Sequence, residues 1–241
     1  MRIAILSDIH GNLTALDAVS ADLWDAAPDL VIHAGDLADG GSSPVEVVDR
    51  IRAMGWPGVM GNGDEMLSRP DSLEEFARRS SAPPALWAVV RGMAAFTREA
   101  LGEVRLSWLG QLPIALVRAG LAVVHASPQT CWKAPPANAP DSDLDRAYGA
   151  LGQPLVVFGH THLPSIRRLT GTVKLLINCG SVGLPHDGDP RASYLLLDDG
   201  TPQIRRVAYD VEKEIQKLAS CGLPSAEWVA LMLRTAAPAM P

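Results

Sequence analysis

The chain has 241 residues, of which 47% are hydrophobic and 20% are charged, so we do not expect disorder, and it can bury the core of one α/β domain. Its formal net charge of −6 disfavours bulk binding of nucleic acid. Cys131, Cys179 and Cys221 show neither a disulfide framework nor a zinc-binding spacing, and we find no signal peptide or run of 18 apolar residues, so we expect a cytoplasmic protein without a membrane partner.

The first quarter of the chain alternates apolar runs with helical patterns, as strands and helices do in an α/β domain. We expect strands at residues 2–7, 30–34 and 58–60. Asn12 is a candidate cap for a helix that extends to about residue 25. Pro44 begins a second predicted helix, which ends near Met54.

The middle and last parts of the chain differ in pattern. From residue 65 to about 110, apolar residues recur three or four apart around an interruption at Pro83, which predicts a helical insertion. Short β runs then follow at residues 114–118, 121–125, 155–158, 166–169, 173–178, 193–197 and 203–207. Because turn residues separate these runs closely, they predict a second sheet that faces the first. A C-terminal helical segment is expected at about residues 210–236.

Residues 128–140 contain four prolines and suit an extended loop better than a packed element. The loop starts three residues after His125, so it could form one wall of a substrate site. The alternative is a surface loop that tucks Trp132 against the body of the protein.

Acid, imidazole and amide side chains follow the predicted strands. They are Asp8, His10, Asp36, Asn62, His125, His160 and His162. Parallel strands deliver such residues to one edge of a sheet, and this mixture of oxygen and nitrogen donors suits two divalent cations about 3.5–4 Å apart. Any one of these residues alone would more often be a cap or a turn former, but seven of them in this arrangement predict a metal site.

Local features indicate how these residues would reach the metals. Asp36 is the candidate bridging carboxylate, and Asn62 supplies a neutral oxygen between two glycines. Asp8 and His10 can face one ion only if the backbone leaves strand geometry after Asp8, which Gly11 favours. His33 lies inside an apolar run, so we interpret it as a core residue or as a residue behind the ligands, and not as a ligand.

The motifs Asp8-Ile9-His10, Gly35-Asp36, Gly61-Asn62-Gly63-Asp64, His125 and Gly159-His160-Thr161-His162 occur in an order that resembles the calcineurin-like metallophosphoesterase superfamily, especially its small bacterial and archaeal phosphodiesterase-like members. The resemblance extends from Met1 to about Asp210. It implies an α/β fold with two facing mixed β-sheets flanked by helices, a four-layer α/β/β/α sandwich. We expect residues 1–241 to form one such domain, including the helical insertion and the C-terminal helical segment.

The resemblance also implies which residues bind each metal. Asp8, His10, Asp36 and His162 would hold the first ion, and Asp36, Asn62, His125 and His160 the second. The expected ions are two divalent metals, with manganese first and iron, zinc, nickel or cobalt as alternatives. Oligomeric state is not predicted.

One departure from the superfamily concerns proton donation. Many members carry a histidine where this chain has Gly63, and that histidine is thought to protonate the leaving group. Either the leaving group needs little protonation, or Asp64 or His186 supplies a proton. His186 lies in a Pro- and Gly-flanked loop and is either solvated or substrate-facing. The candidate catalytic residues are therefore Asp36, Asn62, Asp64 and His186.

The implied activity is hydrolysis of a phosphoester by attack of a metal-bound hydroxide. A phosphodiesterase acting on a small or nucleotide-derived substrate is favoured. A phosphomonoesterase or a dinucleoside-polyphosphate hydrolase is the first alternative. A non-catalytic binding or scaffold protein on the same fold is the second, although the intact set of metal donors argues against it.

Overall fold

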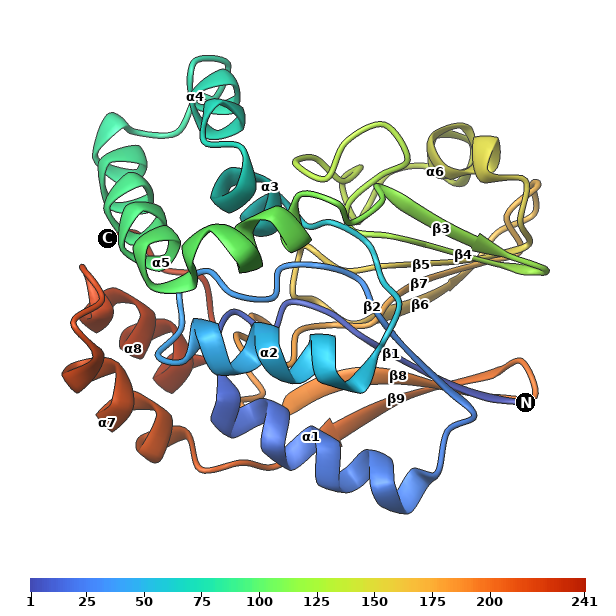
Figure 1. The fold of residues 1–241 in the computed structure, drawn as a ribbon. Helices are drawn as coiled ribbons and strands as arrows, with labels where there is room; N and C mark the ends of the chain where they lie inside the picture. Colours follow the sequence, from blue (N-terminus) through green and yellow to red (C-terminus); the bar gives the residue numbers. More distant parts are fainter.

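In the computed structural model, which describes all 241 residues, two β-sheets face each other and helices cover both outer sides (Figure 1). The first sheet has the order β2 (Leu30–His33), β1 (Arg2–Leu6), β8 (Ala192–Asp198) and β9 (Thr201–Val207). β1 and β2 are parallel, and the other neighbours are antiparallel.

The second sheet has the order β3 (Ala115–Arg118), β4 (Leu121–Val124), β5 (Leu155–Phe158), β7 (Leu175–Asn178) and β6 (Ser165–Arg168). β4, β5 and β7 are parallel, whereas β3 and β6 run antiparallel at the two edges. The carboxyl ends of the parallel strands therefore meet at one edge, where α/β sheets carry ligand sites.

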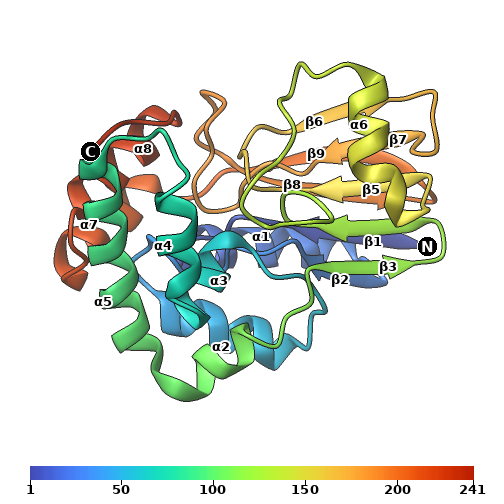
Figure 2. The same ribbon diagram turned by 90° about the horizontal axis from the view of Figure 1, so that it is seen from above.

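Alternation along the strands divides the core into layers. In β1, Ile3 and Ile5 belong to the core between the two sheets, and Ala4 and Leu6 pack with the helices on the outer side. Helices α1 (Leu13–Ala26) and α2 (Pro44–Met54) cover the first sheet. Helix α6 (Asp141–Tyr148), which continues into a 3-10 turn at Gly149–Leu151, covers the second (Figure 2). These layers confirm the predicted α/β/β/α sandwich.

The remaining helices gather at the end of the sandwich opposite the N-terminus (Figure 1). They are α3 (Asn62–Ser68), α4 (Asp71–Ala77), α5 (Pro84–Leu109), α7 (Val211–Cys221) and α8 (Ala226–Thr235). Met93 and Phe96 of α5 pack with Leu218 of α7 and Leu233 of α8. We call α5, α7 and α8 the helical cap. None of the helices combines the length and the apolar character that a membrane span requires.

Some elements differ from the sequence expectation. Residues 58–60, predicted as a strand, form only an isolated bridge between His33 and Gly58. The chain leaves the sheet there because the Met60 N–H donates to Pro113 O, and helix α3 begins two residues later. Helix α6 was not predicted, since only Leu144 and Tyr148 of its eight residues are buried.

The loop of residues 128–140 contains no helix or strand, in agreement with its proline content. Trp132 stacks on Phe76 with 4.8 Å between ring centroids, and its Nε1–H donates to Glu65 at 2.6 Å. The loop is therefore fastened to α3 and α4 through a tucked tryptophan.

Candidate metal centre

Five of the seven predicted ligands lie on sharp turns that follow strands. Asp8, His10, Asp36, His160 and His162 all have left-handed backbone angles, with φ between 49° and 67°. Non-glycine residues rarely adopt this conformation, and such strain is concentrated at functional sites. The backbone therefore leaves strand geometry at Asp8, as the spacing of Asp8 and His10 requires.

Four side chains form a first cluster. His10 Nε2 lies 3.1 Å from His162 Nε2. Asp8 Oδ1 lies 3.3 Å from His162 Nε2 and 4.0 Å from His10 Nε2. Asp36 Oδ2 lies 3.8 Å from His10 Nε2. Two carboxylate oxygens and two imidazole nitrogens thus converge on one small volume.

A second cluster shares Asp36 with the first. Asn62 Oδ1 lies 3.1 Å from His125 Nε2 and 2.8 Å from His160 Nδ1. The two imidazole nitrogens are 3.3 Å apart, and Asp36 Oδ2 lies 3.4 Å from His125 Nε2. The same Asp36 oxygen therefore borders both clusters, which is the position of a bridging ligand.

Hydrogen bonds orient three of the imidazoles. His10 Nδ1 lies 3.0 Å from the carbonyl oxygen of Asp39, His125 Nδ1 lies 2.7 Å from that of Ala34, and His162 Nδ1 lies 2.6 Å from that of Leu184. A carbonyl oxygen can only accept, so we assign the proton to Nδ1 in each ring. In the neutral form of each ring, Nε2 then directs a lone pair into its cluster.

The negatively charged carboxylates of the two clusters are buried away from water. Asp8 is 0% exposed and Asp36 is 2% exposed. Burial by itself would lower the pKa of His10, but the carboxylates of Asp39, Asp36 and Asp8 outweigh it and raise the pKa to about 10. For the same reason Asp36, with help from Asp8, raises the pKa of His125 to about 9 against the effect of burial. The site therefore attracts positive charge.

Asp64 lies beneath Asp36 and away from solvent. Its carboxylate is 0% exposed and accepts the backbone N–H groups of Asp36 at 2.9 Å, Leu37 at 3.0 Å and Gly61 at 2.9 Å. Burial and the nearby charge of Asp36 raise the pKa of Asp64 to about 7, and the backbone donors oppose the shift. Both carboxylate oxygens are occupied by the turns that carry Asp36 and Asn62.

His186 lies beside the first cluster. Its ring stacks on that of His162 with centroids 4.3 Å apart and an interplanar angle of 27°. Its Nε2 is buried and has no hydrogen-bond partner. Burial, followed by the charges of His162 and His10, lowers the pKa of His186 to about 3, so the ring is neutral around pH 7.

His33 is not among the converging residues. It is 0% exposed, neither ring nitrogen has a partner, and its ring lies against Gly58, where a Cβ atom would come within 2.3 Å. These contacts are those of a core residue, as its apolar surroundings in the sequence indicated.

Two polar residues near the site were not singled out in the sequence. Asp39 contacts His10 through its backbone and its side chain. Glu214, on α7, is 1% exposed and accepts the hydroxyls of Thr14 at 2.6 Å and Ser42 at 2.7 Å. No sequence signal joins Glu214 to this region, since its partners lie about two hundred residues away along the chain.

The donor set fits divalent metal ions. Two carboxylates, four imidazoles and one amide oxygen converge, and such mixed nitrogen and oxygen sets suit first-row transition metals. Ligand atoms of Asp8, His10 and His162 lie within 4.8 Å of one another, as do those of Asp8, Asp36 and His125. All seven residues predicted as ligands are thus brought together, while their binding of metal stays a prediction.

The chain is similar to known proteins over most of its length. The sequence model of the calcineurin-like phosphoesterase superfamily domain matches residues 1–201. An uncharacterised protein of Methanocaldococcus jannaschii is 32% identical over 248 residues, which cover 94% of this chain and 95% of the relative.

Two solved structures match nearly the whole chain. A metallophosphoesterase from Sphaerobacter thermophilus is 28% identical with a TM-score of 0.79, covering 98% of this chain and 99% of that one. A hypothetical protein from Pyrococcus horikoshii is 18% identical with a TM-score of 0.83, covering 99% of both chains. The second likeness is one of fold alone.

Proposed function

This chain belongs to the calcineurin-like phosphoesterase superfamily, and we propose that it is a metal-dependent hydrolase that cleaves small phosphodiesters. The observation that carries the proposal is the convergence of seven donor residues in two clusters that share Asp36 Oδ2. Two bound cations would lower the pKa of water and offset the negative charge on the phosphoryl oxygens.

Different residues would hold each of the two cations. Asp8, His10 and His162 would hold the first cation, Asn62, His125 and His160 the second, and Asp36 both. His10, Asn62 and His160 are partly exposed, while the other four ligands are buried. We therefore place the approach of the substrate over these three residues. The four buried residues would fix how deep the two cations lie and how the centre is oriented.

The charge of the site favours a diester over a monoester. The carboxylates of Asp8 and Asp36 pair only with histidines, and no lysine or arginine contacts them. A phosphomonoester brings up to two negative charges and a phosphodiester brings one. A centre whose positive charge comes from the cations alone suits the less charged substrate better.

Proton supply to the leaving group is limited. Gly63 offers no side chain, and the contacts of Asp64 with three backbone N–H groups give it a positioning role beneath Asp36. His186 is neutral, its Nε2 is buried, and its ring stacks on His162, so it is assigned a packing role beside the first cluster and not that of a proton donor. Both assignments favour leaving groups that depart without a strong acid.

The proposal is tested by comparing bis(p-nitrophenyl) phosphate with p-nitrophenyl phosphate, in metal-free protein and after addition of manganese. Asp36→Asn removes the bridging charge, and Asp25→Asn, an exposed aspartate at the end of α1, is the matched control. We expect manganese-dependent cleavage of the diester that is lost in Asp36→Asn and kept in Asp25→Asn.

Other outcomes select the alternatives. Preference for the monoester would replace the diesterase with the phosphomonoesterase or dinucleoside-polyphosphate hydrolase. Binding of two manganese ions without turnover of either compound would contradict a general phosphodiesterase and favour the scaffold.

A further inference from the structure

Asp39 contacts a predicted metal ligand in a way that no other carboxylate does. The His10 Nδ1–H donates to the Asp39 carbonyl oxygen at 3.0 Å, and Asp39 Oδ1 lies 3.3 Å from the same nitrogen. The corresponding nitrogens of His125 and His162 face only a carbonyl oxygen. His10 is thus the one ligand imidazole with a carboxylate behind it.

The Asp39 carboxylate has no other compensation for its charge. Oδ1 is buried and makes no hydrogen bond, and the side chain is 16% exposed. No lysine or arginine pairs with it, so the nearby positive group is the His10 ring. A buried anionic oxygen is costly without a partner, which indicates that this carboxylate is kept for its effect on His10.

The same carboxylate explains the glycine at position 63. A Cβ atom on Gly63 would lie 2.0 Å from Asp39 Oδ1 and 2.5 Å from Asp39 Cγ. The carboxylate therefore occupies the space that a side chain at position 63 would need. A side chain at position 63 and the Asp39 carboxylate behind His10 thus compete for the same space.

We propose that Asp39 is a positioning residue, whose carboxylate fixes the orientation of the His10 ring and makes Nε2 a stronger ligand for the first cation. Partners of this kind behind ligand histidines tune metal affinity by about 10–100-fold. The inference rests on the metal centre of the proposed function, but not on its catalytic activity.

The test compares Asp39→Asn, which keeps the shape of the side chain and removes its charge, with the control Asp25→Asn. Calorimetric titration of the metal-free proteins with Mn²⁺ gives the affinity of each site. Long-range ¹H–¹⁵N spectra of the metal-free proteins report the ring nitrogens of each histidine, so this readout needs neither metal nor turnover.

In Asp39→Asn we expect one of the two Mn²⁺ affinities to fall about 10–100-fold and the His10 ring signals to shift, while those of His125 and His162 stay in place. Asp25→Asn should change neither. Unchanged affinities and unchanged His10 signals would overturn the proposal. A fall in affinity without a change at His10 would also overturn it, because Asp39 would then act as a ligand itself.

Two further measurements keep the outcomes separate. If the wild-type protein binds no Mn²⁺, the proposed function fails, and the His10 signals alone decide whether Asp39 positions the ring. If Asp39→Asn does not fold by circular dichroism, Asp39→Ser carries the same comparison.

A double-mutant cycle tests the link to position 63. Gly63→Ala should displace the Asp39 carboxylate and weaken Mn²⁺ binding by a similar factor. In an Asp39→Ala background, the same Gly63→Ala change should alter the affinity by less than about twofold, because the group it displaces is gone. If the double variant lost affinity by the product of the two single losses, positions 39 and 63 would be independent, and that would contradict a link between them.

Discussion

At the scale of single residues, the buried imidazoles fall into two groups according to what their nitrogens contact. The rings in the two clusters have polar partners on at least one nitrogen, and carboxylates raise the pKa of His10 and His125. His33 has no polar partner at all, and burial lowers its pKa to about 4. His10 and His125 thus attract a proton, whereas burial lowers the pKa of His33 in the core and, together with the charge of His125, that of His160 at the site to about 4.

His33 should make the protein acid-sensitive. The unfolded chain protonates this ring near pH 6.5, whereas the folded protein keeps it neutral down to about pH 4. The unfolded state therefore binds more protons in this window, and stability falls as the pH drops from about 6.5 to 4, by about 3 kcal/mol for this group. Above pH 6.5 the group has no effect on the pH dependence.

The measurement is urea unfolding in EDTA across this pH range for the wild type and for His33→Phe, which keeps a planar ring against Gly58. Any packing penalty of the larger ring is independent of pH, and the other titrating groups cancel in the difference. The wild type should lose about 3 kcal/mol relative to the variant between pH 6.5 and 4. Parallel pH profiles would show that His33 is not the cause.

The sequence identified all seven converging residues because six of them lie within about four residues of the end of a strand and Asn62 follows the apolar run at residues 58–60, and apolar runs can be read from the sequence. It could not separate the roles of Asp64 and Asp39. Both are acidic residues in turns, and only the three-dimensional contacts show that one accepts three backbone N–H groups while the other lies behind His10.

At the scale of elements, α5 depends on a break in its own helix. Gly102 has φ 66° and ψ 168° in the middle of Pro84–Leu109. Before this kink, Met93 packs with the helical cap and Ala94 with the core between the first sheet and its helices. After it, Leu106 and Leu109 pack with that core between sheet and helices alone. The kink thus redirects the helix from the cap to the body of the protein.

Two alanine substitutions in α5 should have opposite effects. Gly102→Ala forces a side chain into a conformation that only glycine adopts easily, and it should lower the free energy of unfolding by about 1–3 kcal/mol. Gly92→Ala lies in the regular part of the helix, where the new Cβ would meet Pro224 Cβ at an ordinary 3.8 Å, so it should raise stability by about 0.5–1 kcal/mol.

Urea denaturation of the two variants beside the wild type measures both effects. A Cβ at Gly102 would meet no atom within 4 Å, so a loss there comes from the backbone and not from a clash. Equal effects of the two substitutions would mean that the kink is unimportant for stability.

Elements with strong periodicity were predictable, and short polar ones were not. The helix at Pro44–Met54 matches its prediction at both ends, and Asn12 caps α1 by accepting the Ala15 N–H at 2.9 Å. Residues 58–60 read as a strand, but they form only one bridge because the chain turns away into α3. Local sequence does not reveal which apolar run will find a neighbouring strand.

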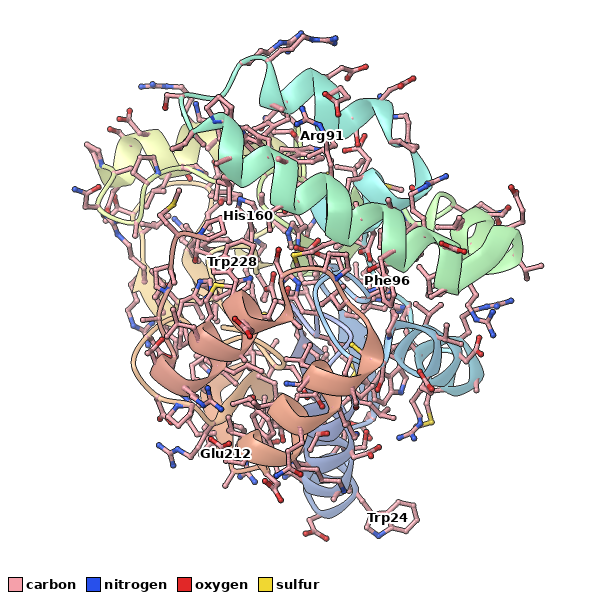
Figure 3. The ribbon with its side chains drawn as sticks, turned by 90° about the vertical axis from the view of Figure 1, so that its left-hand side faces the viewer. Trp24, Arg91, Phe96, His160, Glu212 and Trp228 are labelled. Carbon is pink, nitrogen blue, oxygen red and sulfur yellow. The ribbon has the colours of Figure 1, made fainter.

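At the scale of the whole molecule, the helical cap flanks the edge where the seven predicted ligands converge. Figure 3 shows α5 and α8 at the front, with His160 between them in this view. Glu214 of α7 accepts a hydrogen bond from the hydroxyl of Ser42, which follows Asp39 closely in the chain. Met93 of α5 lies 3.6 Å from the place that a Cβ atom on Gly40 would take. Helices α5 and α7 therefore support the loop beside the candidate metal centre, although they carry none of the seven converging residues.

This arrangement predicts that metal binding is coupled to global stability. The ligands come from turns spread from Asp8 to His162, so the complete site exists only in the folded chain. A ligand that binds the folded state stabilises it by about 2.7 kcal/mol per site at a hundredfold excess over the dissociation constant. Manganese should therefore raise the unfolding temperature, and EDTA should lower it.

Thermal unfolding at increasing Mn²⁺ concentration measures this coupling without any substrate. The midpoint should rise steadily with Mn²⁺ in the wild type and in His33→Phe, whose altered residue lies outside the clusters. The rise should be largely lost in Asp36→Asn, because the substitution removes the oxygen that borders both clusters. Identical midpoints in EDTA and in excess Mn²⁺ would show that the convergence of donors does not bind this metal, and a rise in Asp36→Asn equal to that of the wild type would show that Asp36 does not bridge.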